Sequence, residues 1–184
     1  MEKCKQSEKK LLPEFDQAKE LELLDTLKKS GRNAENKHFA YIELQKFYYK
    51  YRNNDPKYLK LCKQYCEKDI ELLPKVDESY IKREVNTIKR LMAYHNSATK
   101  INYMERIENI KKDGFRASIP AFKRLSIICE KENDFDGAIK YCDAEINYYL
   151  SHGIAHDSDT VQEIYKRREK LIAKQNKLMK DAEK

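Results

Sequence analysis

Residues 118–150 constrain the fold most strongly, because they have the pattern of two amphipathic helices joined by a short turn. In the first half, large apolar residues recur every three or four positions, as they do along one face of a helix. The turn EKENDFDG follows, and Asp134 or Asp136 can accept a hydrogen bond from a free backbone N–H at the start of a second helix. Two amphipathic helices need other helices against which to bury the rest of their apolar surface. The stretch therefore predicts a helical hairpin within a larger all-α fold.

The apolar and small positions of this hairpin follow the pattern of a known repeat. The first helix has the order large–x2–large–small–x2–large, and the second begins aromatic–x2–Ala with small or polar positions four and seven residues further on. The residues in these positions are Phe122, Leu125, Ser126, Cys129, Phe135, Ala138, Cys142 and Glu145. This pattern resembles the tetratricopeptide repeat (TPR). The resemblance implies a short right-handed α-solenoid of about three TPR-like helical hairpins.

Two other segments are similar to this hairpin. YCEKDIELLP, which ends at Pro74, aligns with YCDAEINYYL at a displacement of 76 residues, and that is close to two repeat lengths. EFDQA near the N-terminus repeats DFDGA, with Phe15 in the place of Phe135 and Ala18 in the place of Ala138. Internal similarity of this kind predicts a repeat array.

These similarities divide the chain into expected elements of a single helical repeat domain, 1–184. They are a disordered segment at 1–10, an N-terminal half-repeat helix at 11–30, a first hairpin at 34–74, a degenerate second hairpin at 78–113, a third hairpin at 118–152 and a C-terminal helix at 157–184. Pro13 is expected in the first turn of the N-terminal helix and Pro74 near the end of the first hairpin.

Two parts of this division leave alternatives open. Residues 78–113 contain no Gly or Pro and also fit one long helix, but Asn96-Ser97 can break and cap a helix, so we favour two. The C-terminal helix can cap the last hairpin or form a short coiled-coil seam.

In the helix that begins at residue 34, the expected apolar side consists of Phe39, Leu44, Phe47, Tyr48 and Tyr51.

Charge and composition exclude some classes of protein. The chain has 38 basic and 31 acidic side chains, and its first ten residues are charged where a signal peptide needs an apolar run. No stretch approaches the ~18 apolar residues of a membrane span. Five cysteines at irregular spacings do not resemble a disulfide framework. We therefore expect a soluble, cytoplasmic protein with no membrane partner.

Few residues have the spacing of a catalytic or metal site. Cys62 and Cys66 are one helical turn apart, but a structural zinc site needs about four ligands, and there is no second pair. His152 and His156 flank Gly153 in an expected loop without a carboxylate cluster. No nucleophile–His–acid order or phosphate-binding glycine loop is present. We expect no metal, no cofactor and no enzymatic activity.

In TPR proteins the first helices of successive hairpins line a concave groove that binds a peptide, and the resemblance implies the same here. The positions that match are Lys123, Arg124 and Ile127 in the third hairpin, Arg83, Asn86, Arg90 and Tyr94 in the second, and Gln45, Lys46, Tyr49 and Arg52 in the first. Tyr49 also lies on the opposite side of its helix from Leu44 and Phe47. The set is basic, which favours an acidic peptide segment or a free C-terminal carboxylate.

The expected function is therefore that of a non-enzymatic adaptor that binds an acidic protein segment. The alternative for the groove is that these charges are ordinary solvated helix faces. Two other functions stay open. Residues 82–112 carry eight Lys or Arg against three Glu, and 161–184 carry eight against four acidic residues, so these helices could bind nucleic acid. The C-terminal helix or an exposed repeat edge could form a homodimer.

Overall fold

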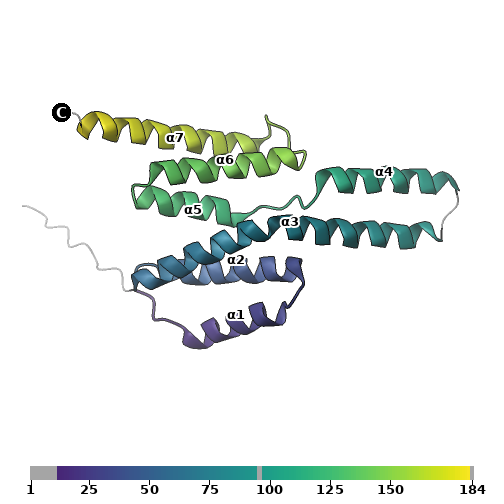
Figure 1. Cartoon of the computed structure of the whole chain (residues 1–184), viewed down its shortest axis with the longest axis horizontal. Helices are drawn as coiled ribbons and strands as arrows, with labels where there is room; N and C mark the ends of the chain where they lie inside the picture. The colour runs from purple at the N-terminus through teal and green to yellow at the C-terminus, as the bar shows by residue number, and fades with distance from the viewer. Residues whose placement is uncertain (1–11, 95–96, 183–184) are drawn as a thin grey trace, which may run out of the picture.

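The computed structural model describes residues 12–94 and 97–182, and this part of the chain consists of α-helices without a strand (Figure 1). The all-α prediction is confirmed. The segment 1–10, Leu11 and Asn96 lie outside the described residues. The helices are α1 (Gln17–Lys29), α2 (Ala34–Lys50), α3 (Pro56–Met92), α4 (Ser97–Asp113), α5 (Pro120–Lys131), α6 (Phe135–Ser151) and α7 (Asp159–Ala182).

Short polar side chains start several of these helices. Asp16 and Asn33 each accept a hydrogen bond of 2.9 Å from the backbone N–H three residues further on, at the starts of α1 and α2. Asp55 accepts one of 2.8 Å from the N–H of Lys57 and is followed by Pro56 at the first position of α3. These side chains satisfy N–H groups that have no partner within the helix.

The helices predicted between residues 118 and 152 are confirmed as α5 and α6. Asp134, rather than Asp136, is the N-cap of α6 and accepts a hydrogen bond of 2.9 Å from the N–H of Gly137. Seven of the eight pattern positions are buried, and Glu145 is half-buried. The sequence was sufficient to predict these two helices because the capping residue and the apolar spacing that specify them lie within one hairpin.

The predicted helix end near Pro74 is wrong, since α3 continues through this residue to Met92. Pro74 itself is exposed, whereas Leu73 and Val76 are buried in the core shared with α2 and α5. Burial of the neighbouring side chains offsets the cost of a proline inside a helix, about 3 kcal/mol. Figure 1 shows α3 bending near its middle, as a proline permits.

The segment 78–113 therefore contains the second half of α3 and the whole of α4. One long helix is excluded, because the first helix ends at Met92 and the next begins at Ser97. The favoured interpretation of two helices is confirmed, but the first of them is continuous with the preceding helix. The expected hairpins at 34–74 and 78–113 share α3 as a consequence.

The N-terminal helix begins later in the chain than the predicted helix at 11–30. It begins at Gln17, so Pro13 precedes the helix instead of lying in its first turn. Phe15 precedes the N-cap of α1, whereas Phe135 follows the N-cap of α6, and Ala18 is exposed where Ala138 is fully buried. EFDQA and DFDGA are thus similar in sequence but not equivalent in structure.

Phe15 instead packs outside the helix, against an aromatic cluster. Its ring centroid lies 5.4 Å from that of Phe47, 4.9 Å from that of Tyr51 and 4.5 Å from that of Tyr58. The cluster joins the segment before α1 to α2 and α3.

Four of the five residues predicted on the apolar side of α2 are buried, namely Leu44, Phe47, Tyr48 and Tyr51. The fifth, Phe39, is 55% exposed, so its assignment to this side is wrong.

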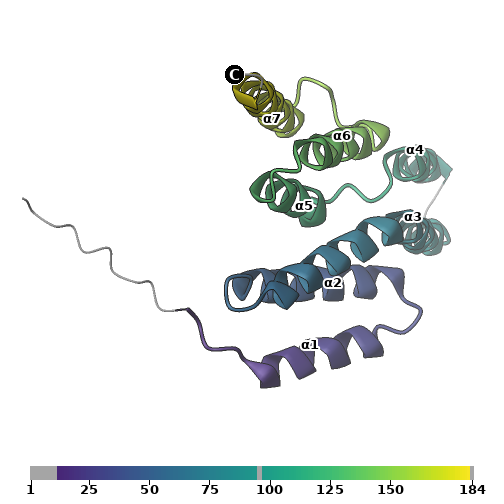
Figure 2. The ribbon, with the colours of Figure 1, turned by 60° about the vertical axis from the view of Figure 1, so that its left-hand side comes forward.

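The helices pack in a stacked order that Figures 1 and 2 both show. α2 pairs with the first half of α3, α5 packs on this pair, α6 on α5, and α7 on α6. The first core cluster joins α2, α3 and α5, and the second joins α5, α6 and α7. The second half of α3 and α4 extend away from the stack and enclose a small separate cluster of Val85, Ile88 and Ile107.

Candidate functional site

Four residues that the sequence placed in a groove come together at one cavity. Tyr49 of α2 and Lys123, Arg124 and Ile127 of α5 line a cavity of about 290 Å³. The rest of its wall consists of Ser118, Ile119, Pro120 and Glu145. The α4–α5 connection and the start of α5 supply the apolar part of this wall, and α2 and α5 supply its cationic and aromatic part.

A larger cavity of about 710 Å³ adjoins the first and shares Ser118, Lys123 and Glu145 with it. Ile164 and Leu171 of α7 line its apolar part. Basic side chains of α7 also line it, namely Lys166, Arg167, Lys170 and Lys174. We call the residues that line these two cavities the basic face. The sequence prediction missed the contribution of α7, although its run of basic residues was a signal for it.

Only part of this positive charge is neutralised within the protein. Glu130 pairs with Arg167 at 2.8 Å and with Lys174 at 2.5 Å, and hydrogen bonds from Lys174 and Arg167 lower the pKa of this carboxyl. Within residues 12–94 and 97–182, Lys123, Lys166 and Lys170 form no ion pair. The basic face therefore presents uncompensated cations beside apolar surface.

Glu145 is the acidic residue common to both cavities. Burial raises the pKa of its carboxyl to about 7, against the opposing effect of Lys123 and Arg167. The side chain is half-buried. Near neutral pH, a substantial fraction of this carboxyl is uncharged, so Glu145 cancels less of the positive charge than its residue type indicates.

A buried polar network holds Arg124 in place. Arg124 Nη1 donates to Gln45 Oε1 at 2.7 Å, and Gln45 Nε2 donates to Asp69 Oδ2 at 3.0 Å. The other oxygen of Asp69 lies 2.6 Å from His38 Nδ1. His38, Gln45 and Asp69 are at most 1% exposed. Since the amide nitrogen of Gln45 is held by Asp69, its oxygen is directed at Arg124, which orients the guanidinium in advance.

The sequence prediction did not identify this network. It assigned Gln45 to the groove surface, and that is wrong, because the side chain is fully buried. His38 and Asp69 were not singled out. They lie 31 residues apart in the chain, so no local pattern pairs them.

Three cations lie close to the ring of Tyr49, one from the turn after α2 and two from α5. The guanidinium carbon of Arg52 lies 4.2 Å from the centroid of its ring, that of Arg124 5.8 Å and the ammonium nitrogen of Lys131 5.8 Å. Arg52 also donates from Nη1 to the carbonyl oxygen of Tyr49 at 2.6 Å. Lys131 was not among the predicted site residues. We call Tyr49, Arg52, Arg124 and Lys131 the Tyr49 cluster.

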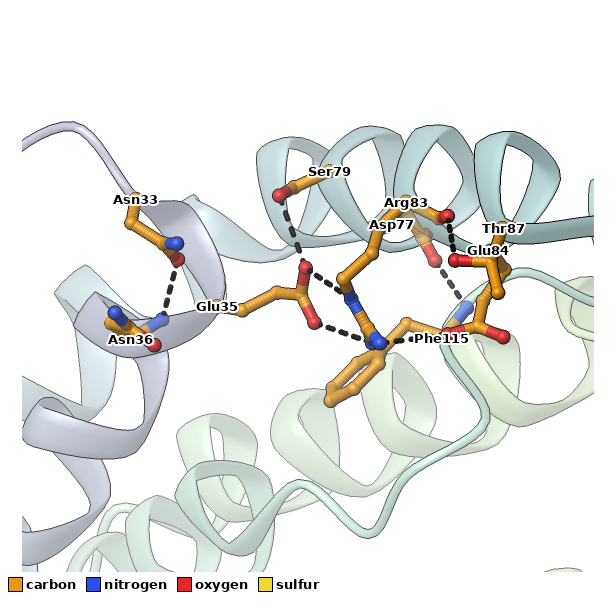
Figure 3. Close-up of polar contacts among 9 residues, drawn as sticks. All are labelled: Asn33, Glu35, Asn36, Asp77, Ser79, Arg83, Glu84, Thr87 and Phe115. Carbon is orange, nitrogen blue, oxygen red and sulfur yellow. Dashed lines mark hydrogen bonds and ion pairs between the residues drawn. The ribbon is translucent and has the colours of Figure 1, made fainter. Parts of the chain in front are cut away.

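The remaining predicted residues lie elsewhere. Arg83 is paired with Glu35 of α2 at 2.9 Å and with Glu84 at 2.7 Å, and Figure 3 shows its guanidinium directed at Glu35. Ser79 donates to the same carboxylate at 3.2 Å. Arg83 thus joins α2 to α3.

Asn86 lines a separate cavity of about 560 Å³ on the second half of α3, together with Ile81, Val85 and Lys111. Arg90 and Tyr94 are exposed at the end of α3, and Lys46 pairs with Glu43 at 2.7 Å. None of these residues lines the basic face.

The cysteines and histidines that were considered as metal ligands interact with other protein groups. Cys62 and Cys66 are fully buried, and the hydrogen bond with Cys62 together with burial raises the pKa of the Cys66 thiol. His152 lies 2.7 Å from Asp77, and His156 lies 2.9 Å from the hydroxyl of Tyr165. Across the described residues, no group of three or more His, Cys, Asp or Glu side chains is arranged to hold a metal ion. Among the described helices, none combines the length and the hydropathy that a membrane span requires.

Comparison with known proteins found no match: no protein-family model, no curated protein and no solved structure is significantly similar to this chain.

Proposed function

We propose that this chain is a non-enzymatic protein-interaction module that binds an acidic peptide segment on its basic face. In this proposal α2 with the first half of α3, and α5 with α6, are TPR-like hairpins, and α7 covers the last of them. The observation that carries the proposal is the convergence of Tyr49, Lys123, Arg124 and Ile127 on one cavity that continues into a second, lysine-lined cavity.

The chemistry of the face suits a peptide with acidic and apolar side chains. Lys123, Lys166 and Lys170 would attract carboxylates, while the half-buried Ile127 would contact an apolar side chain of the peptide. Arg124 is held by Gln45 before a ligand arrives, so less side-chain entropy is lost on binding. Affinity should fall with rising salt, because exposed charges contribute to it.

The test uses three fluorescein-labelled pools of degenerate peptides, which are rich in Glu, rich in Lys or neutral. Fluorescence anisotropy of the full chain should show binding to the Glu-rich pool and little binding to the other two. The double charge reversal Lys123→Glu with Lys170→Glu should weaken that binding by about tenfold or more.

The matched control reverses two exposed charges away from the face, Lys89→Glu with Arg90→Glu on the second half of α3. It changes the net charge of the protein by the same amount and should retain most of the affinity. Equal loss in both double variants would show a nonspecific charge effect and contradict the proposal. Tighter binding of a mixed-sequence single-stranded DNA than of the Glu-rich pool would favour nucleic-acid binding instead.

A further inference from the structure

The Tyr49 cluster is a concentration of positive charge that the fold leaves without an anion. Arg52 lies two residues after the end of α2. Arg124 lies near the middle of α5 and Lys131 is the last residue of this helix, and all three approach the ring of Tyr49. In the described part of the chain, no carboxylate pairs with any of the three. Lys63 of α3, by contrast, pairs with Glu132 at 2.7 Å.

Two of these side chains are held by the protein in a way that leaves donors available. Arg52 stacks on the Tyr49 ring and donates Nη1 to the carbonyl oxygen of Tyr49, while its buried Nε has no hydrogen-bond partner. Arg124 is oriented by Gln45 through Nη1. Because both guanidinium groups are already held in place, less side-chain entropy is lost when an anion binds to them.

Three like charges around one ring repel one another, and an anion between them would relieve that repulsion. A carboxylate carries one negative charge and two oxygens. A phosphoryl group carries a charge near −2 at neutral pH and three oxygens, and it matches the planar donors of arginine. The number of converging cations therefore favours a phosphoryl group.

The neighbouring cavity indicates what carries this group. Tyr49 and Arg124 belong both to the cluster and to the cavity of about 290 Å³, whose wall also includes Ile119, Pro120 and Ile127. A ligand bound at the cluster thus has an apolar site directly beside it. Free phosphate would not use that site, whereas the residue next to a phosphorylated side chain in a peptide could.

We infer that the Tyr49 cluster binds the phosphoryl group of a phosphoserine in an acidic peptide, with the adjacent peptide residue in the cavity beside Ile127. This inference rests on the proposed function, because it specifies one position of the peptide that the basic face would bind. It adds Arg52 and Lys131, which line neither cavity, to the binding residues.

The test compares three acidic peptide pools that differ at one central position, which is phosphoserine, serine or glutamate. For the full chain, we expect the phosphoserine pool to bind about tenfold more tightly than the other two. Lys131→Gln should reduce this ratio toward one with little effect on the serine pool. Because Lys131 is exposed, this variant should fold normally. Arg52→Gln should act in the same direction, with its fold checked by circular dichroism.

Lys170→Gln is the matched control, because it removes a cation of the basic face outside the cluster. It should weaken binding of all three pools by similar factors and keep the phosphoserine preference. Equal binding of the phosphoserine and glutamate pools to the wild-type protein would overturn the inference and leave the proposed function standing. Failure of all three pools to bind would contradict the proposed function itself. Displacement of the phosphoserine pool by inorganic phosphate at equal concentration would overturn the assignment to a peptide.

Discussion

His38 and Asp69 form a hydrogen-bonded pair in the interior of the protein, with His38 Nδ1 on α2 2.6 Å from Asp69 Oδ1 on α3. The two side chains are 1% and 0% exposed. Asp69 also accepts a hydrogen bond of 3.0 Å from Gln45, which in turn accepts one from Arg124 at the basic face. The pair thus links the packing of α2 and α3 to the orientation of a binding residue.

Asp69→Asn should lower the free energy of unfolding by about 1–3 kcal/mol. A carboxylate accepts hydrogen bonds from both His38 and Gln45, whereas an amide can accept at only one of its two ends. If the amide oxygen accepts from Gln45, the amide NH2 faces His38, and the His38 ring must then either oppose a donor with a donor or change to the tautomer with an unprotonated Nδ1. Urea unfolding of the variant measures this loss. Glu71→Gln, the same chemical change at an exposed position of α3, should stay within about 0.5 kcal/mol of the wild type.

Gly114→Ala should destabilise the protein more than Gly31→Ala does. Both glycines have a positive φ, +57° and +55°, so each alanine costs about 1 kcal/mol of backbone strain. At Gly114 an added Cβ would also lie 2.7 Å from Asp77 Oδ1 and 2.9 Å from His152 Cδ2. These atoms cannot easily move, because Asp77 accepts hydrogen bonds from Phe115 at 2.6 Å and from His152 at 2.7 Å.

The expected losses are about 2–4 kcal/mol for Gly114→Ala and about 1 kcal/mol for Gly31→Ala, measured by thermal or urea unfolding. The difference between them reports the contact of the α4–α5 connection with Asp77 and His152. Equal losses at the two glycines would mean that this contact does not restrain the connection.

Glu145 should make stability depend on pH. Burial raises the pKa of this carboxyl in the folded protein to about 7 from an ordinary 4.5, so folding favours the protonated form. Its stabilising contribution is complete below about pH 4.5, declines as the pH rises, and is lost above about pH 7.

Glu145→Gln should therefore raise the free energy of unfolding at pH 8 by about 1–2 kcal/mol and change it little at pH 4, allowing for partial solvent screening. Urea unfolding at the two pH values measures this. Glu163→Gln, an exposed carboxyl that lines the same face, should stay within about 0.5 kcal/mol of the wild type at both. A Glu145→Gln variant no more stable than wild type at pH 8 would contradict the account of this carboxyl.

The part of the fold that could be predicted from sequence is the part specified locally. α5 and α6 were predicted with their turn and their buried positions because Asp134 caps a helix from within the hairpin and the apolar spacing is continuous. Pro74 misled the prediction, because the packing of Leu73 and Val76 against other helices outweighs the intrinsic preference of proline. A sequence pattern does not contain those tertiary contacts.

The same distinction applies to the candidate site. Lys123, Arg124 and Ile127 were predicted together because their register on α5 was secure, and Tyr49 joined them across α2. Arg83, Asn86 and Arg90 were assigned on the assumption of a middle hairpin in the stack, whereas the second half of α3 extends away from it (Figure 1). Lys131 and the lysines of α7 come into place only through the packing of α5 and α7.

The most direct test of the proposed binding face locates the bound peptide. A Glu-rich degenerate pool that carries a benzophenone group would be cross-linked by light to the full chain, and the linked residues identified by mass spectrometry. We predict cross-links on α5, on α7 and at the end of α2 beside Tyr49, which a salt wash before illumination should diminish. Cross-links on α4 and the second half of α3, or scattered evenly over the protein, would contradict the account.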